Sequence, residues 1–144
     1  MNELTDIAHL IQSAVAPVFL LSGVAAMLGV LTNRLARIVD RARSIEGQLS
    51  AHPGASEQLH ADLRVLARRA GYVNVAISLC AIAALLVALV VVTLFANAFL
   101  RAGLAWLIAL LFVASMVCLA AAFIAFFIEV RYATAALRIG AGHI

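Results

Sequence analysis

The stretch LSGVAAMLGVLTNRLARIVDRARSIEGQL, residues 21–49, decides how this chain is organised. Its first half is apolar enough to lie in a lipid bilayer. Its second half carries four arginines, Arg34, Arg37, Arg41 and Arg43, and no proline or glycine separates the two halves. We therefore predict one continuous helix that leaves a membrane on the cytoplasmic side.

Apolar residues dominate the composition and are unevenly distributed. They make up 66% of the 144 residues, against roughly 45–50% in soluble domains. They gather in three blocks, at about residues 14–31, 72–100 and 103–130, and each reaches the ~18 residues typical of a membrane-spanning helix. Glu3 and Asp6 lie where a signal peptide carries basic residues, so we expect the first block to be retained. The sequence predicts an all-α polytopic membrane protein in which residues 1–144 form a single membrane domain.

The segment between the first two blocks has the pattern of a helical hairpin. After Leu31, apolar residues recur at alternating steps of three and four, and this alternation returns after a turn signal at residues 51–55, where Ser56 can cap a new helix. The two seams consist of Leu35, Ile38, Ala42, Ile45 and Leu49, and of Leu59, Leu63, Leu66, Ala70 and Val73. Helices joined by a short loop pack antiparallel. We predict a cytoplasmic antiparallel hairpin at about residues 32–71, with coiled-coil spacing and with arms that continue the first two spans.

Arginines are strongly biased to one side of the predicted spans. Seven lie between the first and second spans and two in the tail at residues 131–144, whereas Arg101 alone lies between the second and third spans. Positive charge favours the cytoplasmic side, and Trp106 suits the outer interface as Tyr72 and Tyr132 suit the inner one. We predict a periplasmic N-terminus and a cytoplasmic C-terminus. Because the charges flank apolar spans, they do not indicate a nucleic-acid partner.

Residues 17–43, PVFLLSGVAAMLGVLTNRLARIVDRAR, resemble an uncharacterised bacterial family of small three-span membrane proteins, a domain of unknown function. The matching positions are Leu21, Ser22, Gly23, Thr32, Asn33, Arg34, Arg37, Asp40, Arg41 and Arg43, with a weaker match at residues 67–70 and at Asn74. The resemblance implies a multi-pass protein of the bacterial inner membrane and leaves its activity open. The order of the spans is also similar to that of the proton-channel subunits that energise flagellar stators and outer-membrane transport.

The arginine cluster has two interpretations. On a helix, Arg34, Arg37 and Arg41 lie on one side, beside the apolar seam, and Arg43 extends the cluster. Just inside a membrane, such a cluster suits anionic lipid head groups, at about 1 kcal/mol per charge, or a cytoplasmic protein partner. The alternative is that these arginines only set topology and pair with Asp40 on the same helix.

Glu129 is the acidic residue nearest to a span. A buried intramembrane carboxylate suggests a functional site. The third block is long enough, however, to leave Glu129 at the interface, near Arg131 and the arginines of the hairpin. We therefore predict a structural ion pair that involves Glu129 and Arg131.

The second span has two distinct faces. Small residues recur at i+4 steps along it and along the third span, at Ala76, Cys80, Ala84 and Ala88 and at Ala114, Cys118 and Ala122, and this spacing favours close helix packing. Polar residues lie on the opposite side of the second span, at Asn74, Ser78, Thr93 and Asn97. In a homo-oligomer they would line a pore with an apolar gate. Otherwise they form hydrogen bonds between helices.

Enzymatic motifs are absent from the sequence. It has no GxSxG, HExxH, CxxC or phosphate-binding loop motif, so we predict neither an enzyme nor a cofactor. His52 and His60 lie near Glu57 and Asp62, a set that suits a metal ion, but solvated loop histidines are the simpler interpretation and we predict no metal.

Two functions remain. In the first, a homo-oligomeric scaffold or interaction protein presents the arginine-rich hairpin to anionic lipid or to a partner. In the second, a homo-oligomer forms an ion channel or a channel subunit.

Overall fold

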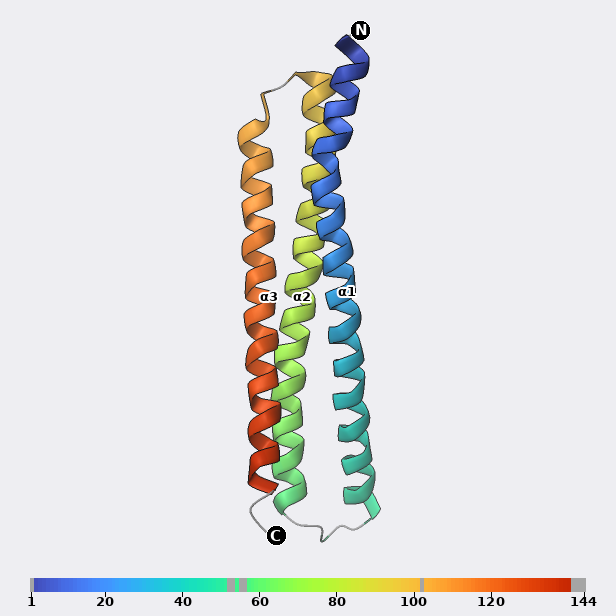
Figure 1. The fold of residues 1–144 in the computed structure, drawn as a ribbon. Coiled ribbons are helices and arrows are strands. Elements are labelled where there is room, and N and C mark those ends of the chain that lie inside the picture. The colour runs from blue at the N-terminus through green and yellow to red at the C-terminus, as the bar shows by residue number, and fades with distance from the viewer. Residues whose placement is uncertain (1, 52–53, 55–56, 102, 141–144) are drawn as a thin grey trace. The chain divides into compact units, whose positions relative to one another are not determined.

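The computed structural model describes residues 2–51, 54, 57–101 and 103–140. They form three helices, α1 (Asn2–Ala51), α2 (Glu57–Leu100) and α3 (Ala105–Gly140), which Figure 1 shows as long uninterrupted ribbons. No β-strand occurs among these residues. His52, Pro53 and the predicted cap at Ser56 lie outside the described residues, as does the chain beyond residue 140.

Each helix is long and apolar enough to cross a membrane, so the three predicted apolar spans are confirmed as helices. The helices extend well beyond the spans. Helix α1 passes through Pro17 without ending, and α3 includes most of the segment that we predicted as a separate tail. In the most apolar window of α3 only 11% of the residues are buried inside the chain. Most of its surface therefore needs lipid or another protein to cover it.

The chain divides into two compact units, which we describe separately. The first unit comprises Met1–Leu28 and Leu79–Ala121. Most of its buried side chains are small or β-branched, namely Ala14, Val24, Cys80, Ala83, Val87, Val90 and Ser115, and Pro17 is buried as well. Phe19, Phe99 and Trp106 are exposed. Small residues inside and large apolar residues outside are typical of helices solvated by lipid, where close backbone approach drives packing.

The buried face of α2 follows a different spacing from the one predicted. Ala76 and Cys80 are fully buried, but the row then continues through Ala83, Val87 and Val90, whereas Ala88 is exposed. Each i+4 step advances about 40° around a helix of 3.6 residues per turn, so a strict i+4 stripe turns away from a neighbouring helix. Alternating steps of four and three keep the buried row on one side.

The turn after α2 is held by Asn97. The backbone N–H of Arg101 donates to the carbonyl oxygen of Asn97 at 2.9 Å, and Arg101 adopts a left-handed φ of 49°. This geometry is the αL ending of a helix. The side-chain Oδ1 of Asn97 accepts a second hydrogen bond, 2.9 Å long, from the backbone N–H of Leu104. Gly103, with a φ of 64°, completes the reversal because glycine tolerates this conformation.

Replacing Asn97 with alanine should weaken this turn by about 1 kcal/mol, because the Leu104 N–H loses its acceptor. We expect hydrogen exchange at the Leu104 amide to accelerate about fivefold, the factor that this energy corresponds to. Asn74→Ala on the same helix is the matched control, since the Asn74 side chain is exposed. An unchanged exchange rate in Asn97→Ala would contradict the capping role.

Candidate functional site

The second unit comprises Gly29–Ser78 and Ala122–Ile144. Four of the ten predicted seam residues are buried in it, Ile38 and Ile45 of α1 and Leu66 and Val73 of α2, and the other six are half-buried. Ile38 and Leu66 also line one cavity of about 350 Å³. The alternating steps of three and four therefore identify the inward-facing sides of both helices.

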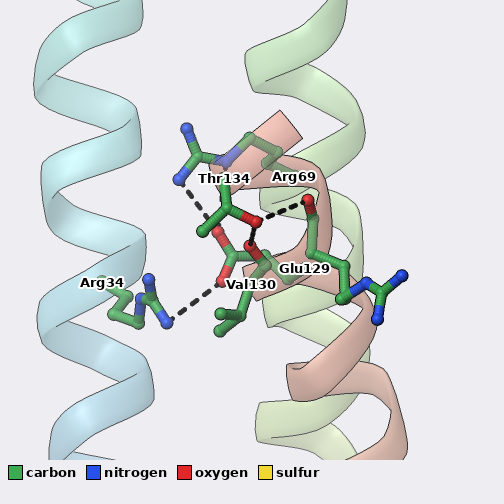
Figure 2. Close-up of polar contacts among 6 residues, drawn as sticks. Arg34, Arg69, Glu129, Val130 and Thr134 are labelled. Atoms are coloured by element: carbon green, nitrogen blue, oxygen red, sulfur yellow. Dashed lines mark hydrogen bonds and ion pairs between the residues drawn. The ribbon is translucent and has the colours of Figure 1, made fainter. Parts of the chain in front are cut away.

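A carboxylate on α3 joins the three helices of this unit. The Glu129 side chain is fully buried. Its Oε1 accepts hydrogen bonds from Nε and Nη2 of Arg69 at 3.1 and 3.0 Å. Its Oε2 lies 3.4 Å from Nη1 of Arg34, an ion-pair contact without hydrogen-bond geometry. Figure 2 shows Arg34 of α1 and Arg69 of α2 reaching the same carboxylate.

The two arginines differ in how firmly they are held. Arg69 donates two hydrogen bonds to one oxygen, and 22% of its side chain is exposed. Arg34 has 32% of its side chain exposed, and its guanidinium carbon lies 5.2 Å from the ring centroid of Phe126. A buried carboxylate without partners would lose several kcal/mol of hydration. Arg69 supplies both hydrogen bonds that replace this hydration, whereas Arg34 adds an ion-pair contact alone.

The structure gives Glu129 other ion partners than the predicted Arg131. Two residues apart on α3, these side chains leave the helix about 200° apart. The guanidinium of Arg131 lies 6.0 Å from the ring centroid of Phe127 instead. Glu129 pairs with Arg34 and Arg69, which both belong to the segment that we predicted as a hairpin. The ion pair is thus a contact between helices.

The arginines also line a cavity of about 480 Å³ in the second unit. Its polar lining residues are Asn33, Arg34, Arg37, Arg41 and Arg69. Ile38 and Leu66 contribute apolar walls, and the described lining contains no acidic side chain. Guanidinium groups donate up to five N–H bonds and match phosphate and carboxylate oxygens in pairs. The cavity is therefore suited to an anion that carries an apolar portion.

Three of the four arginines predicted to contact lipid or a partner, Arg34, Arg37 and Arg41, come together in this cavity. Arg43 is exposed and does not line it. Among the described residues, none of these arginines forms an ion pair with Asp40.

Arg69 was counted among the arginines of the predicted hairpin but was not singled out as a site residue. It lies one turn before Tyr72, as Glu129 lies one turn before Tyr132. Both tyrosines were predicted at the inner interface, and their rings stack with centroids 5.7 Å apart. The sequence therefore indicated that Arg69 and Glu129 lie at the same depth, because each precedes by one turn a tyrosine predicted at the inner interface.

Among the four residues predicted to line a pore, the side chains of three form hydrogen bonds to residues that are close to them in sequence. The Ser78 hydroxyl donates to the carbonyl oxygen of Asn74 at 3.0 Å, and the Thr93 hydroxyl donates to that of Leu89 at 2.7 Å. Asn97 caps the turn described above. Pore lining by Asn74, Ser78, Thr93 and Asn97 stays a prediction.

The residues weighed for a metal site are partly outside the described chain, because His52 is not described. Among the described residues, no group of three His, Cys, Asp or Glu side chains is placed to hold a metal ion. Asp62 lines a second arginine-containing cavity in the same unit.

These features define a class: an all-helical protein with three apolar helices, which suggest a multi-pass membrane protein, and with an arginine-lined cavity beside a buried carboxylate. The chain belongs to the family described as "Protein of unknown function (DUF2721)", whose model matches residues 14–139. Comparison with curated proteins and with solved structures gave no match.

Proposed function

We propose that this chain is a non-enzymatic protein of the bacterial inner membrane that binds the phosphate groups of anionic lipids at the cytoplasmic leaflet. The observation that carries the proposal is the cavity lined by Arg34, Arg37, Arg41 and Arg69. Near a membrane surface each such charge contributes about 1 kcal/mol toward an anionic lipid. Apolar walls from Ile38 and Leu66 suit the carbon atoms next to a phosphate group.

The four arginines of the cavity have different roles. Arg69 is a positioning residue, because both of its hydrogen bonds hold Glu129. Arg37 and Arg41 are exposed and form no ion pair with a carboxylate of the described residues. Arg34 contacts Glu129 and lines the cavity as well. Arg37 and Arg41 therefore supply most of the charge that a ligand meets.

The proposal includes the threading predicted from the sequence. Residues 32–71 form an antiparallel hairpin in the cytoplasm, the N-terminus is periplasmic and the C-terminus is cytoplasmic. The nine arginines on one side and the single Arg101 on the other support this orientation. The exposed apolar surface of α3 supports assembly into a homo-oligomer. Such an assembly would act as a scaffold that gathers anionic lipid or holds a cytoplasmic protein beside it.

The test compares two double variants with the same loss of charge. Full-length protein in neutral detergent is titrated with phosphatidylglycerol, and bound lipid is counted by native mass spectrometry. We expect Arg37→Gln with Arg41→Gln to lower the affinity about 30-fold, because two charges at about 1 kcal/mol each are lost. Arg43→Gln with Arg68→Gln removes two exposed arginines that line no described cavity, and should change the affinity less than threefold.

An equal loss in both double variants would mean that lipid responds only to net charge, and the proposed site would be abandoned. Absence of phosphatidylglycerol binding to the unaltered protein would have the same consequence.

A further inference from the structure

A second cavity in the same unit shares the arginines of the first. Its volume is about 560 Å³, and Arg34, Arg41 and Arg69 line both cavities. Arg37 lines only the first cavity, whereas Asp62 and Ala133 line only the second. Arg34, Arg41 and Arg69 therefore form part of the wall of both cavities.

One guanidinium group can bind an anion in each of the two cavities at once. It is planar and carries five N–H donors along its edges, so it can bond to one anion from one edge and to another from a second edge. A phosphodiester offers two free oxygens, which match one such edge. The arrangement thus accommodates one phosphate group on each side of the shared arginines.

The formal charge of the site also indicates two phosphate groups. The two cavities and the carboxylate behind them contain four guanidinium groups, Arg34, Arg37, Arg41 and Arg69, and two carboxylates, Asp62 and Glu129. The sum is +4 − 2 = +2. One phosphodiester would leave a positive charge unmatched, whereas two phosphodiesters neutralise the site.

We propose that the ligand is a lipid with two phosphodiester groups on one short bridge, as in cardiolipin, with one phosphate in each cavity. This inference rests on the proposed function and names its lipid class. Apolar residues on both sides, Ile38 in the first cavity and Ile45 and Val65 in the second, face the carbon atoms of the bridge and of the acyl chains. A soluble diphosphate shares the anionic chemistry but lacks those carbon atoms.

The experiment compares four probes on the full-length protein in neutral detergent: cardiolipin, phosphatidylglycerol, phosphatidic acid and ADP. Concentrations are matched by phosphate, and affinity is read by native mass spectrometry. Linking two phosphates makes the second contact intramolecular, so cardiolipin should bind on the order of 10²-fold more tightly than phosphatidylglycerol. ADP at the same phosphate concentration should not displace it.

Variants of the second cavity locate the effect. Ala133→Phe places a large side chain in that cavity, and cardiolipin affinity should fall to the phosphatidylglycerol level while phosphatidylglycerol binding is unchanged. Val65→Phe fills the same cavity from α2 and keeps the test valid if Ala133→Phe does not fold. Ala61→Phe, at an exposed position outside the described cavities, is the control and should retain the preference.

Several outcomes would overturn the inference. Equal affinity for cardiolipin and phosphatidylglycerol would remove the two-phosphate ligand and leave the proposed function intact. So would a cardiolipin preference that survives both cavity-filling variants. Phosphatidic acid binding as tightly as cardiolipin would assign the +2 charge to one dianionic phosphate, and displacement by ADP would assign it to a soluble ligand. No binding of any anionic lipid would refute the proposed function itself.

Discussion

Replacing Arg69 with methionine is expected to destabilise the second unit by about 3 kcal/mol. The substitution removes both hydrogen bonds to Glu129 Oε1 and leaves a fully buried carboxylate. Removal of one partner of a buried ion pair costs roughly 3–5 kcal/mol. We expect the lower end of that range because Arg34 remains 3.4 Å from Oε2 and can move closer. The midpoint of SDS unfolding in mixed micelles, together with hydrogen exchange of residues 57–78, measures the loss.

The reverse substitution, Glu129→Leu, should cost less than Arg69→Met. It leaves two arginines without their anion, but their side chains are 32% and 22% exposed and can turn toward water. Combining Arg69→Met with Glu129→Leu should recover most of the stability lost in Arg69→Met, since well-packed apolar residues often replace a buried pair at little cost.

Arg68→Met is the matched control for Arg69→Met. Arg68 is the preceding residue on α2 and is exposed, so its loss should change stability by no more than about 0.5 kcal/mol. If Arg68→Met and Arg69→Met were equally destabilising, or if the double substitution cost as much as the sum of its parts, the buried pair would not be what ties these helices together.

The number of helices was predictable because bilayer thickness sets a minimum length for apolar blocks. The ends of the helices were less predictable, because hydropathy marks where a helix leaves lipid but not where it ends in water. Helix α1 therefore begins at Asn2, well before the apolar block, and α3 reaches Gly140. The seam residues Ile38, Ile45, Leu66 and Val73 were predictable from local spacing, because alternating steps of three and four keep one side of a helix inward.

Only the part of the site that lies on a single helix was predictable from the sequence. Arg34, Arg37 and Arg41 share a helix face, which spacing alone indicates. Arg69 lies 60 residues from Glu129, and the pairing depends on how far each helix extends and which side it turns inward. Arg131 and the arginines of the hairpin were both expected near Glu129, but two residues along α3 Arg131 lies on another side of that helix. A long-range ion pair is therefore identified by packing rather than by proximity in the chain.

A thiol-labelling experiment should give an all-or-none result for residue 54. In a background with Cys80→Ala and Cys118→Ala, Gly54→Cys should react with a membrane-impermeant maleimide only after the inner membrane is opened. Glu3→Cys, an exposed position near the N-terminus, should react in intact cells. The nine arginines expected on the cytoplasmic side require this outcome, because their transfer across the bilayer is strongly disfavoured.

Gly54→Cys is a suitable probe because a Cβ added at this position meets nothing within 4 Å. Leu100→Cys, on an exposed residue at the end of α2, provides a second position on the side that we propose as periplasmic and should react like Glu3→Cys. Labelling of residue 54 in intact cells would place the proposed hairpin outside, away from the leaflet whose lipids we propose as ligands. Because the arginine cavity and residue 54 both belong to the second unit, such a result would overturn the threading and the lipid assignment together.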